Sequence, residues 1–289
     1  MQFDLFADSR DVMLRNDLIE ALRARDLPAA RTARTRLVAA CPQDALLAPA
    51  EILLDQLGRR VRPFADAPAA KRVVEHVDTE IRRAAVLVFG VAKAEEWLAP
   101  LWQALAEAVA AQPFDPEVPE AHAVGLLMRL RQWLPAREAA EAIPSWRRMP
   151  CTLAWMGEIA FELDGLAGAW PLLAELAWID ATRFAALARR LPAPPLARLL
   201  RDFDRDLAAD DDAELAWFPA FALIAEPGLA EVLRNARTPA QDPPEQAAHT
   251  VMQLLSLERQ GRHHEVVAKR KALLALNEAL FKRYLATRA

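Results

Sequence analysis

The sequence has few cysteines. Its 289 residues include two, Cys41 and Cys151, which are too few for a disulfide framework or for a zinc site made of thiolates. Cys151 follows Pro150 at an expected helix start, where the helix dipole can lower the pKa of a thiol. No His/Asn pairing accompanies it, so we interpret both cysteines as small buried residues.

The sequence is also poor in the motifs that carry catalysis. The eight glycines are scattered, and neither G-x-G-x-x-G nor G-x-x-x-x-G-K-[ST] occurs, which argues against a phosphate-binding loop. The nucleophile elbow G-x-S-x-G is missing, and the chain has three serines to replace it. We therefore expect no catalytic residues of a known type. A helical enzyme with a site made of dispersed polar residues stays open as an alternative.

Metal-binding patterns are incomplete. The run Asp202, Asp204 and Asp206 begins like a calcium loop, but Leu207 replaces its glycine and Ala213 its bidentate glutamate. The five histidines do not form H-E-x-x-H, the arrangement that directs two imidazoles and a base to one zinc ion. We expect no metal and no cofactor.

Strong charge and long apolar runs are missing as well. A net charge of -4 gives no overall field that attracts nucleic acid, so we expect no direct nucleic-acid binding. No apolar run approaches the length that spans a bilayer, and the N-terminus is acidic where a signal peptide is basic. We expect a soluble, cytoplasmic protein without a membrane partner.

Helix-forming residues dominate what is present. Hydrophobic residues make up 54% of the chain, mostly alanine and leucine, while the residues that suit strands are sparse. The composition predicts an all-α protein. Prolines, which are tolerated in the first helical turn and disruptive further in, delimit the segments. The helices expected from these stops lie near 9–25, 28–40, 46–57, 68–89, 92–111, 119–132, 135–143, 151–163, 166–178, 180–191, 195–208, 212–225, 228–235, 244–260, 263–275 and 277–287.

A helix-turn-helix phrase recurs along the chain. It first runs from Leu18 to Cys41, breaks at Arg25-Asp26, restarts at Leu27 and closes at Pro42. Similar phrases follow at intervals of about 30 to 36 residues, as stacked helical hairpins require. The positions expected to allow close packing of the two helices are Leu18, Leu54, Gly90, Gly125, Gly157, Leu187, Ala220 and Leu254.

One unit resembles the tetratricopeptide repeat (TPR), a helix-turn-helix unit of about 34 residues. Its pattern consists of Leu153, Met156-Gly157, Ala160, a turn at Asp164-Gly165, Ala169 and Leu173. The resemblance implies a TPR-like solenoid, a right-handed superhelix of about 14 to 16 helices. The domain expected is 9–289, after an extended segment 1–8, with sub-boundaries near 112–119 and 236–244. An irregular helical bundle is the alternative.

The repeat class implies a protein-protein interaction scaffold or adaptor that holds a peptide or protein partner on its concave face. By analogy with the family, the residues facing the groove are His122, Arg129, Glu158 and Phe161. Helical spacing suggests that most of the eight tryptophans are core residues, with an aromatic binding groove as the alternative.

A short N-terminal motif suggests another partner. The run Gln2, Phe3, Asp4, Leu5 and Phe6 resembles the pentapeptide Gln-Leu-Asp/Ser-Leu-Phe by which bacterial replication and repair proteins bind the sliding clamp. A free end of this kind could insert Leu5 and Phe6 into an apolar pocket. The resemblance implies an accessory factor tethered to the clamp, and the alternative is a segment that caps the first repeat.

Overall fold

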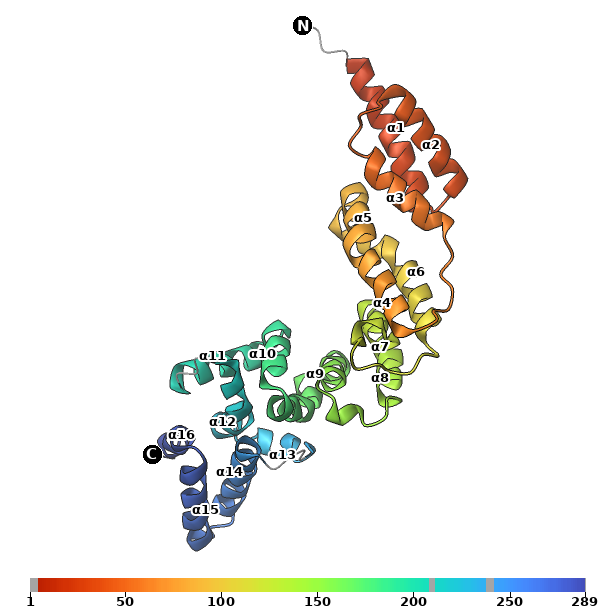
Figure 1. The fold of residues 1–289 in the computed structure, drawn as a ribbon. Coiled ribbons are helices and arrows are strands. Elements are labelled where there is room, and N and C mark those ends of the chain that lie inside the picture. The colour runs from red at the N-terminus through yellow and green to blue at the C-terminus, as the bar shows by residue number, and fades with distance from the viewer. Residues whose placement is uncertain (1–4, 208–210, 238–241, 289) are drawn as a thin grey trace. The chain divides into compact units, whose positions relative to one another are not determined.

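A computed structural model describes residues 5–207, 211–237 and 242–288 (Figure 1). The chain is 80% helix, and the described residues contain no strand, which confirms the all-α prediction. It divides into two compact units, Met1–Gln132 and Trp133–Ala289. The division falls between Gln132 and Trp133, whereas the predicted sub-boundaries lie near 112–119 and 236–244.

The first unit is built from consecutive helices that contact their neighbours. α1 packs on α2, α2 on α3, α3 on α5, α5 on α6 and α6 on α7. Its elements are α1 (Leu5–Arg23), α2 (Leu27–Ala40), α3 (Leu47–Gly58), α4 (Ala67–His76), the π-helix η1 (Val77–Ile81), α5 (Arg82–Phe89), α6 (Val91–Val109), the 3₁₀-helix η2 (Pro119–Ala121) and α7 (Ala123–Arg129). Because Val77 and Arg82 keep helical backbone angles, α4, η1 and α5 form one continuous helix. This confirms the long helix predicted over 68–89.

Aspartate caps and prolines position the helix starts in this unit. The Asp26 carboxylate accepts a hydrogen bond from the Ala29 N–H at 3.0 Å, and Asp66 accepts one from the Ala69 N–H at 2.7 Å. In both cases a proline occupies the first turn, where its missing N–H costs nothing. The same phrase, Asp-x-Pro-Ala, therefore starts α2 and α4.

Gly90 has a different role from the one predicted. It joins α5 to α6 with a φ of 78°, and nothing lies within 4 Å of where its Cβ would be. A side chain would be strained at this angle, whereas glycine is not. Gly90 is therefore a turn residue, and its assignment as a close-packing position is wrong.

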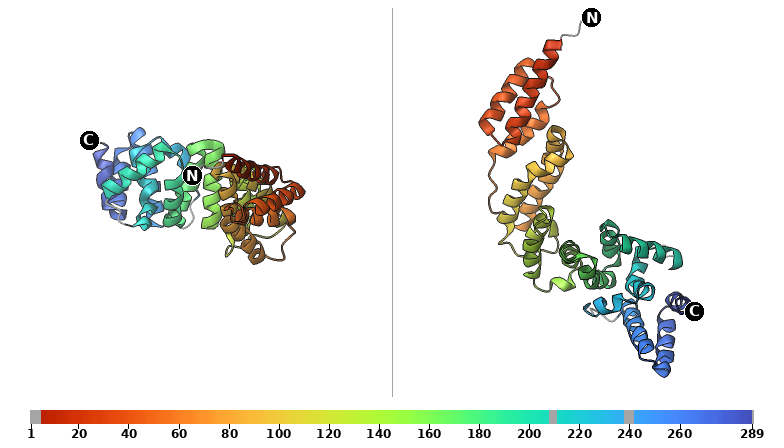
Figure 2. Two further views of the ribbon diagram at one scale, coloured as in Figure 1. Left: turned by 90° about the horizontal axis from the view of Figure 1, so that it is seen from above. Right: turned by 180° about the vertical axis from the view of Figure 1, so that it is seen from behind.

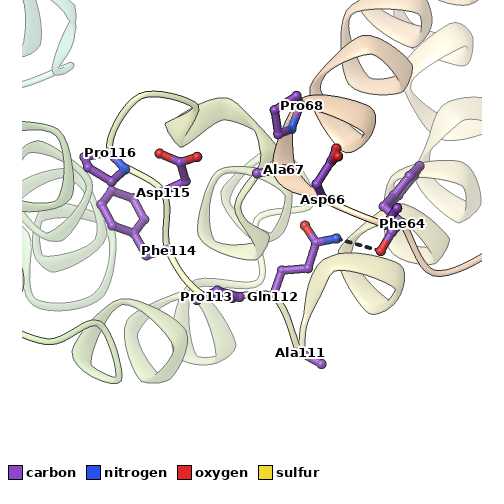
Figure 3. A pocket seen from close by; sticks show the side chains of 11 residues that line it. Phe64, Asp66, Ala67, Pro68, Ala111, Gln112, Pro113, Phe114, Asp115 and Pro116 are labelled. Carbon is purple, nitrogen blue, oxygen red and sulfur yellow. Dashed lines mark hydrogen bonds between the residues drawn. The ribbon is translucent and has the colours of Figure 1, made fainter.

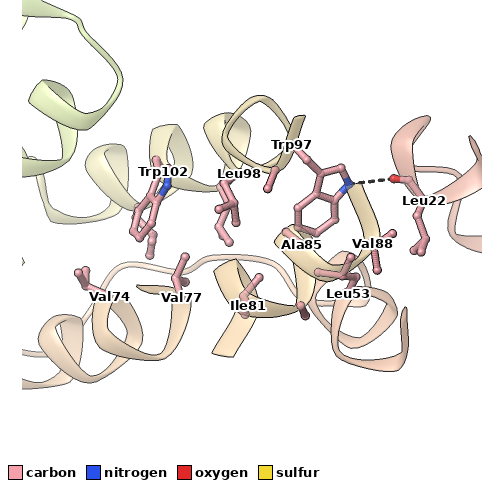
Figure 4. Packing of buried hydrophobic residues seen from close by; sticks show 14 of the residues in the cluster. Leu22, Leu53, Val74, Val77, Ile81, Ala85, Val88, Trp97, Leu98 and Trp102 are labelled. Atoms are coloured by element: carbon pink, nitrogen blue, oxygen red, sulfur yellow. Dashed lines mark hydrogen bonds between the residues drawn. The ribbon is translucent and has the colours of Figure 1, made fainter. Parts of the chain in front are cut away.

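The core of the first unit forms along the continuous helix (Figure 4). Its inward face carries Val74, Val77, Ile81, Ala85 and Val88, which are all buried. Two tryptophans of α6 are buried with them, and Trp97 donates its indole N–H to the Leu22 carbonyl at 2.8 Å. That bond ties α6 to α1 and satisfies a polar group that would otherwise be buried unpaired.

The second unit also consists of helices packed on one another. α9 packs on α10, α12 on α14 and α14 on α15, and Figure 2 shows the α14–α15 hairpin from behind. Its elements are α8 (Trp133–Glu141), the 3₁₀-helix η3 (Trp146–Arg148), α9 (Pro150–Ile179), α10 (Ala181–Arg190), α11 (Pro194–Leu207), the 3₁₀-helix η4 (Asp212–Trp217), α12 (Phe218–Ala225), α13 (Leu229–Leu233), α14 (Pro243–Arg259), α15 (His263–Leu276) and α16 (Glu278–Ala286).

The predicted turn at Asp164-Gly165 is present inside α9. Gly165 has φ 70° and ψ -171°, which is not helical. A Cβ on Gly157 would lie 3.6 Å from the Leu173 side chain and 3.3 Å from that of Leu187. Residues 16 apart in a straight helix are about 24 Å apart, so the two arms of α9 fold back on each other. Gly157 therefore lies at a close approach of the two arms, as predicted, and a side chain there would be in tight contact with Leu187.

Two further predictions concern the N-terminal segment and a membrane span. α1 begins at Leu5, within the segment 1–8 that was expected to be extended, and residues 1–4 lie outside the described part of the chain. Among the described residues, no helix combines the length and the apolar character needed to cross a bilayer.

Candidate functional site

His122 and Arg129, predicted to face a groove, both have partners inside the first unit. The His122 Nδ1 accepts a hydrogen bond from the Val124 N–H at 3.3 Å and so caps α7, and burial lowers its pKa. The Arg129 guanidinium donates two hydrogen bonds of 2.6 Å to Asp78 and lies 4.8 Å from the centre of the Trp102 ring. These contacts explain both side chains without a ligand.

Glu158 and Phe161 belong to the second unit. Glu158 accepts a hydrogen bond of 2.6 Å from Arg190. Burial raises the pKa of its carboxyl against the opposing effect of Arg190, and Glu162 raises it further. Phe161 is half-buried on the first arm of α9. Within this unit Phe161 is the predicted groove residue whose role stays open.

The clamp-binding motif falls at the edge of the described residues. Gln2, Phe3 and Asp4 lie outside them, and Leu5 and Phe6 form the first turn of α1. The motif stays a prediction.

Neither cysteine has the lowered pKa of a reactive thiolate. Burial raises the pKa of the Cys151 thiol, contrary to the lowered pKa of a reactive thiolate. A hydrogen bond to Asp11 raises that of Cys41. Within the described ranges, no three His, Cys, Asp or Glu side chains are grouped so that they could hold a metal ion.

An apolar groove in the first unit is the candidate functional site. It lies between α3 and the continuous helix and encloses about 450 Å³. We call this the α3–α5 groove, and its lining residues are Ala48, Pro49, Ile52, Thr79, Glu80, Arg83, Ala84 and Leu87. Buried Pro49 and Ala84 provide apolar surface at its base, while Leu87 is 62% exposed.

Polar residues lie beside this apolar surface. Glu80 is 3.5 Å from His76 on the same helix, and Arg83 has no ion-pair partner among the described residues. Thr79 donates its hydroxyl to the Glu75 carbonyl at 2.8 Å. A partner bound here would therefore meet an apolar floor and one unpaired cation, a combination typical of protein interfaces.

The helix wall of the groove has a local irregularity. Thr79 and Glu80 belong to the π-helix η1, which inserts an extra residue into the helical turn. Such π-bulges are frequent at functional sites. The sequence predicted a long helix over 68–89 but no π-turn within it, because the residue types there do not indicate one.

Comparisons with protein families, with curated proteins and with solved structures find no match to this chain. The function must therefore be inferred from the residues and geometry of the chain itself.

Proposed function

We propose that the protein is a non-enzymatic scaffold of the TPR-like helical-repeat type, which binds an amphipathic helix of a partner protein in the α3–α5 groove. The observation that carries this proposal is the exposure of Leu87 beside a groove with a buried apolar floor. Helix-in-groove recognition uses apolar anchors spaced along one face of the ligand helix.

Other features support the repeat class. Several pairs of successive helices pack on one another, such as α1 with α2 and α14 with α15, and the arms of α9 form a hairpin at the best match to the repeat pattern. Stacked helical hairpins commonly present extended binding surfaces, and such surfaces need no catalytic groups. An association through a surface groove is consistent with the scattered polar residues of this chain.

The contribution of Leu87 to the binding of a partner can be given upper and lower limits. Complete burial of a leucine side chain stabilises by about 1.5–3 kcal/mol, and 62% of Leu87 remains exposed. A partner that covers it would gain about 1–2 kcal/mol, close to a tenfold change in affinity. Replacing Leu87 with glutamate would remove this gain and add a charge that must be desolvated, so we expect a loss of more than about tenfold.

A displayed library of amphipathic helices, selected on the full-length protein, tests the proposal. Selected peptides are expected to carry apolar anchors three, four or seven residues apart, and to lose affinity for the Leu87→Glu variant. Isothermal titration calorimetry of one such peptide gives the size of the loss.

Leu134 provides a matched control because it is a leucine of the second unit with 61% exposure. Leu134→Glu should leave binding unchanged. Peptides that bind the wild type and both variants equally, or selected peptides without a helical apolar pattern, would show that the α3–α5 groove is not the binding site.

A further inference from the structure

A second cavity of the first unit lies away from the α3–α5 groove. It encloses about 550 Å³ where the connection from α3 to α4 meets the segment that follows α6 (Figure 3). We call it the loop pocket, and its lining residues are Phe64, Ala65, Asp66, Ala67, Pro68, Ala111, Gln112, Pro113, Phe114, Asp115 and Pro116. None of them lines the other groove.

The lining has charge of one sign. Asp66 and Asp115 contribute carboxylates, and no lysine, arginine or histidine lines the pocket. Three arginines, at positions 59, 60 and 62, occupy the same connection but are not part of the lining. A bound group of positive charge would therefore meet two carboxylates and no repulsion from the lining.

Both carboxylates are held in place and retain a free oxygen. One oxygen of Asp66 caps α4 at 2.7 Å from the Ala69 nitrogen, and one of Asp115 accepts the Glu117 N–H at 3.0 Å. Within the described residues, the second oxygen of each has no hydrogen-bond partner. The backbone bonds fix the side chains, so that little entropy is lost when a ligand binds the free oxygens.

A glutamine joins the two sides of the pocket. Gln112 donates its amide N–H to the Phe64 carbonyl at 3.1 Å, and its Oε1 is buried without a partner among the described residues. In Figure 3 the Gln112 amide lies below Asp66, and Asp115 lies on the opposite side of the view. The acceptors available in the pocket are thus the Gln112 Oε1 and the second oxygens of Asp66 and Asp115, and the remaining walls are aromatic, proline or alanine.

We propose that the loop pocket binds an arginine side chain of a partner peptide. A guanidinium is planar, pairs with carboxylates through several N–H donors and stacks on aromatic rings. Phe64 and Phe114 supply rings, and the prolines supply apolar surface for the methylene groups of arginine. A divalent cation fits less well, because it requires more oxygen ligands than these two carboxylates provide.

The test titrates the full-length, ¹⁵N-labelled protein with the blocked peptide acetyl-Gly-Arg-Gly-amide and follows the backbone NMR resonances. We expect saturable shifts concentrated at residues 64–68 and 111–116. The same peptide with citrulline, which has the shape of arginine without its charge, should produce no saturable shift. A lysine peptide that binds as tightly as the arginine peptide would overturn the assignment to a guanidinium.

Asparagine substitutions separate charge from folding. Asp66→Asn and Asp115→Asn keep an oxygen for the backbone N–H bonds, since asparagine caps helices as well as aspartate does. The double variant should bind the arginine peptide at least about tenfold more weakly. Asp26→Asn is the matched control, because Asp26 caps α2 in the same Asp-x-Pro-Ala phrase.

Unchanged binding by the double variant would overturn the proposal. The Leu87→Glu variant should still bind the arginine peptide, because Leu87 does not line the loop pocket. Failure of this proposal and failure of the α3–α5 groove as a helix-binding site are therefore distinguishable.

Discussion

The ion pair between Arg147 and Glu175 is expected to stabilise the second unit strongly. Glu175 is 2% exposed, and Arg147 donates two hydrogen bonds of 2.7 Å to its two carboxylate oxygens. The backbone N–H of Arg237 donates a third, also at 2.7 Å. One buried carboxylate thus connects α9, η3 and the segment that follows α13. We predict that Glu175→Gln destabilises this unit.

The size of the effect follows from the unequal burial of the two partners. The variant loses at least one charge-assisted hydrogen bond, worth about 1.5–3 kcal/mol, and leaves the Arg147 charge unpaired. Removing one partner of a fully buried pair costs about 3–5 kcal/mol. Arg147 is 23% exposed and retains some hydration, so we expect about 3 kcal/mol, the lower end of that range.

Urea unfolding and hydrogen exchange measure this loss. Exchange should increase most in peptides that cover 143–149 and 229–237, which the pair holds together. Glu158→Gln is the control, since Glu158 pairs with Arg190, which is 65% exposed. Because solvent screens the exposed Arg190 guanidinium, we expect this pair to contribute less, about 0–1 kcal/mol. The reasoning is refuted if Glu175→Gln costs no more than Glu158→Gln, or if its added exchange is spread evenly over the unit.

Three further predictions concern single features of the fold. Burial lowers the pKa of His122, so the unfolded chain takes up a proton more readily than the folded one. The contribution of neutral His122 to folding stability is therefore complete above about pH 6.5. It is lost as the pH falls through the lower pKa of the folded state. Thermal melts of wild type and His122→Asn, which keeps a capping acceptor, should converge on acidification, and parallel melts would contradict this. Gly157→Leu should destabilise by about 1–3 kcal/mol through overpacking against Leu173 and Leu187, measured by urea unfolding; an unchanged midpoint would show that the hairpin can open. If Gln2–Phe6 binds the sliding clamp, deleting residues 2–6 should abolish clamp binding in surface plasmon resonance and leave the melting temperature unchanged, whereas a large loss of stability would assign the segment to the fold.

Helix positions were predictable from local residue types. Asp26 and Asp66 cap helices that proline starts, and Gly165 provides the turn inside α9. These signals depend on backbone angles and on hydrogen bonds within a few residues, and the sequence displays such features directly. The close approach at Gly157 was predictable as well, from the small residues of one repeat.

Long-range partners were not predictable in the same way. Arg129 pairs with Asp78, which is 51 residues earlier in the chain, and no sequence pattern indicated this partner. The sequence of a predicted helix does not show which residue a charged side chain pairs with, or how exposed that side chain is. Gly90 was misassigned for a related reason, because a turn glycine and a packing glycine look alike in a repeat register.

The α3–α5 groove also depends on tertiary structure. It lies between α3 and the continuous helix and includes two residues of the π-helix η1, and no residue pattern indicates this arrangement. The exposure of Leu87 could not be predicted from the sequence either, because a leucine on a periodic helix is normally interpreted as a core residue.

Photo-crosslinking tests the central claim most directly. A benzoylphenylalanine at Thr79, on the wall of the α3–α5 groove, should crosslink a selected amphipathic helix, and the same group at Thr32 should not. The two sites are matched, since each threonine is exposed and donates its hydroxyl to a carbonyl four residues earlier. A crosslink at Thr79 that an excess of unlabelled peptide removes is the predicted result. Equal crosslinking at both positions, or none at Thr79 while the peptide still binds, would contradict the account.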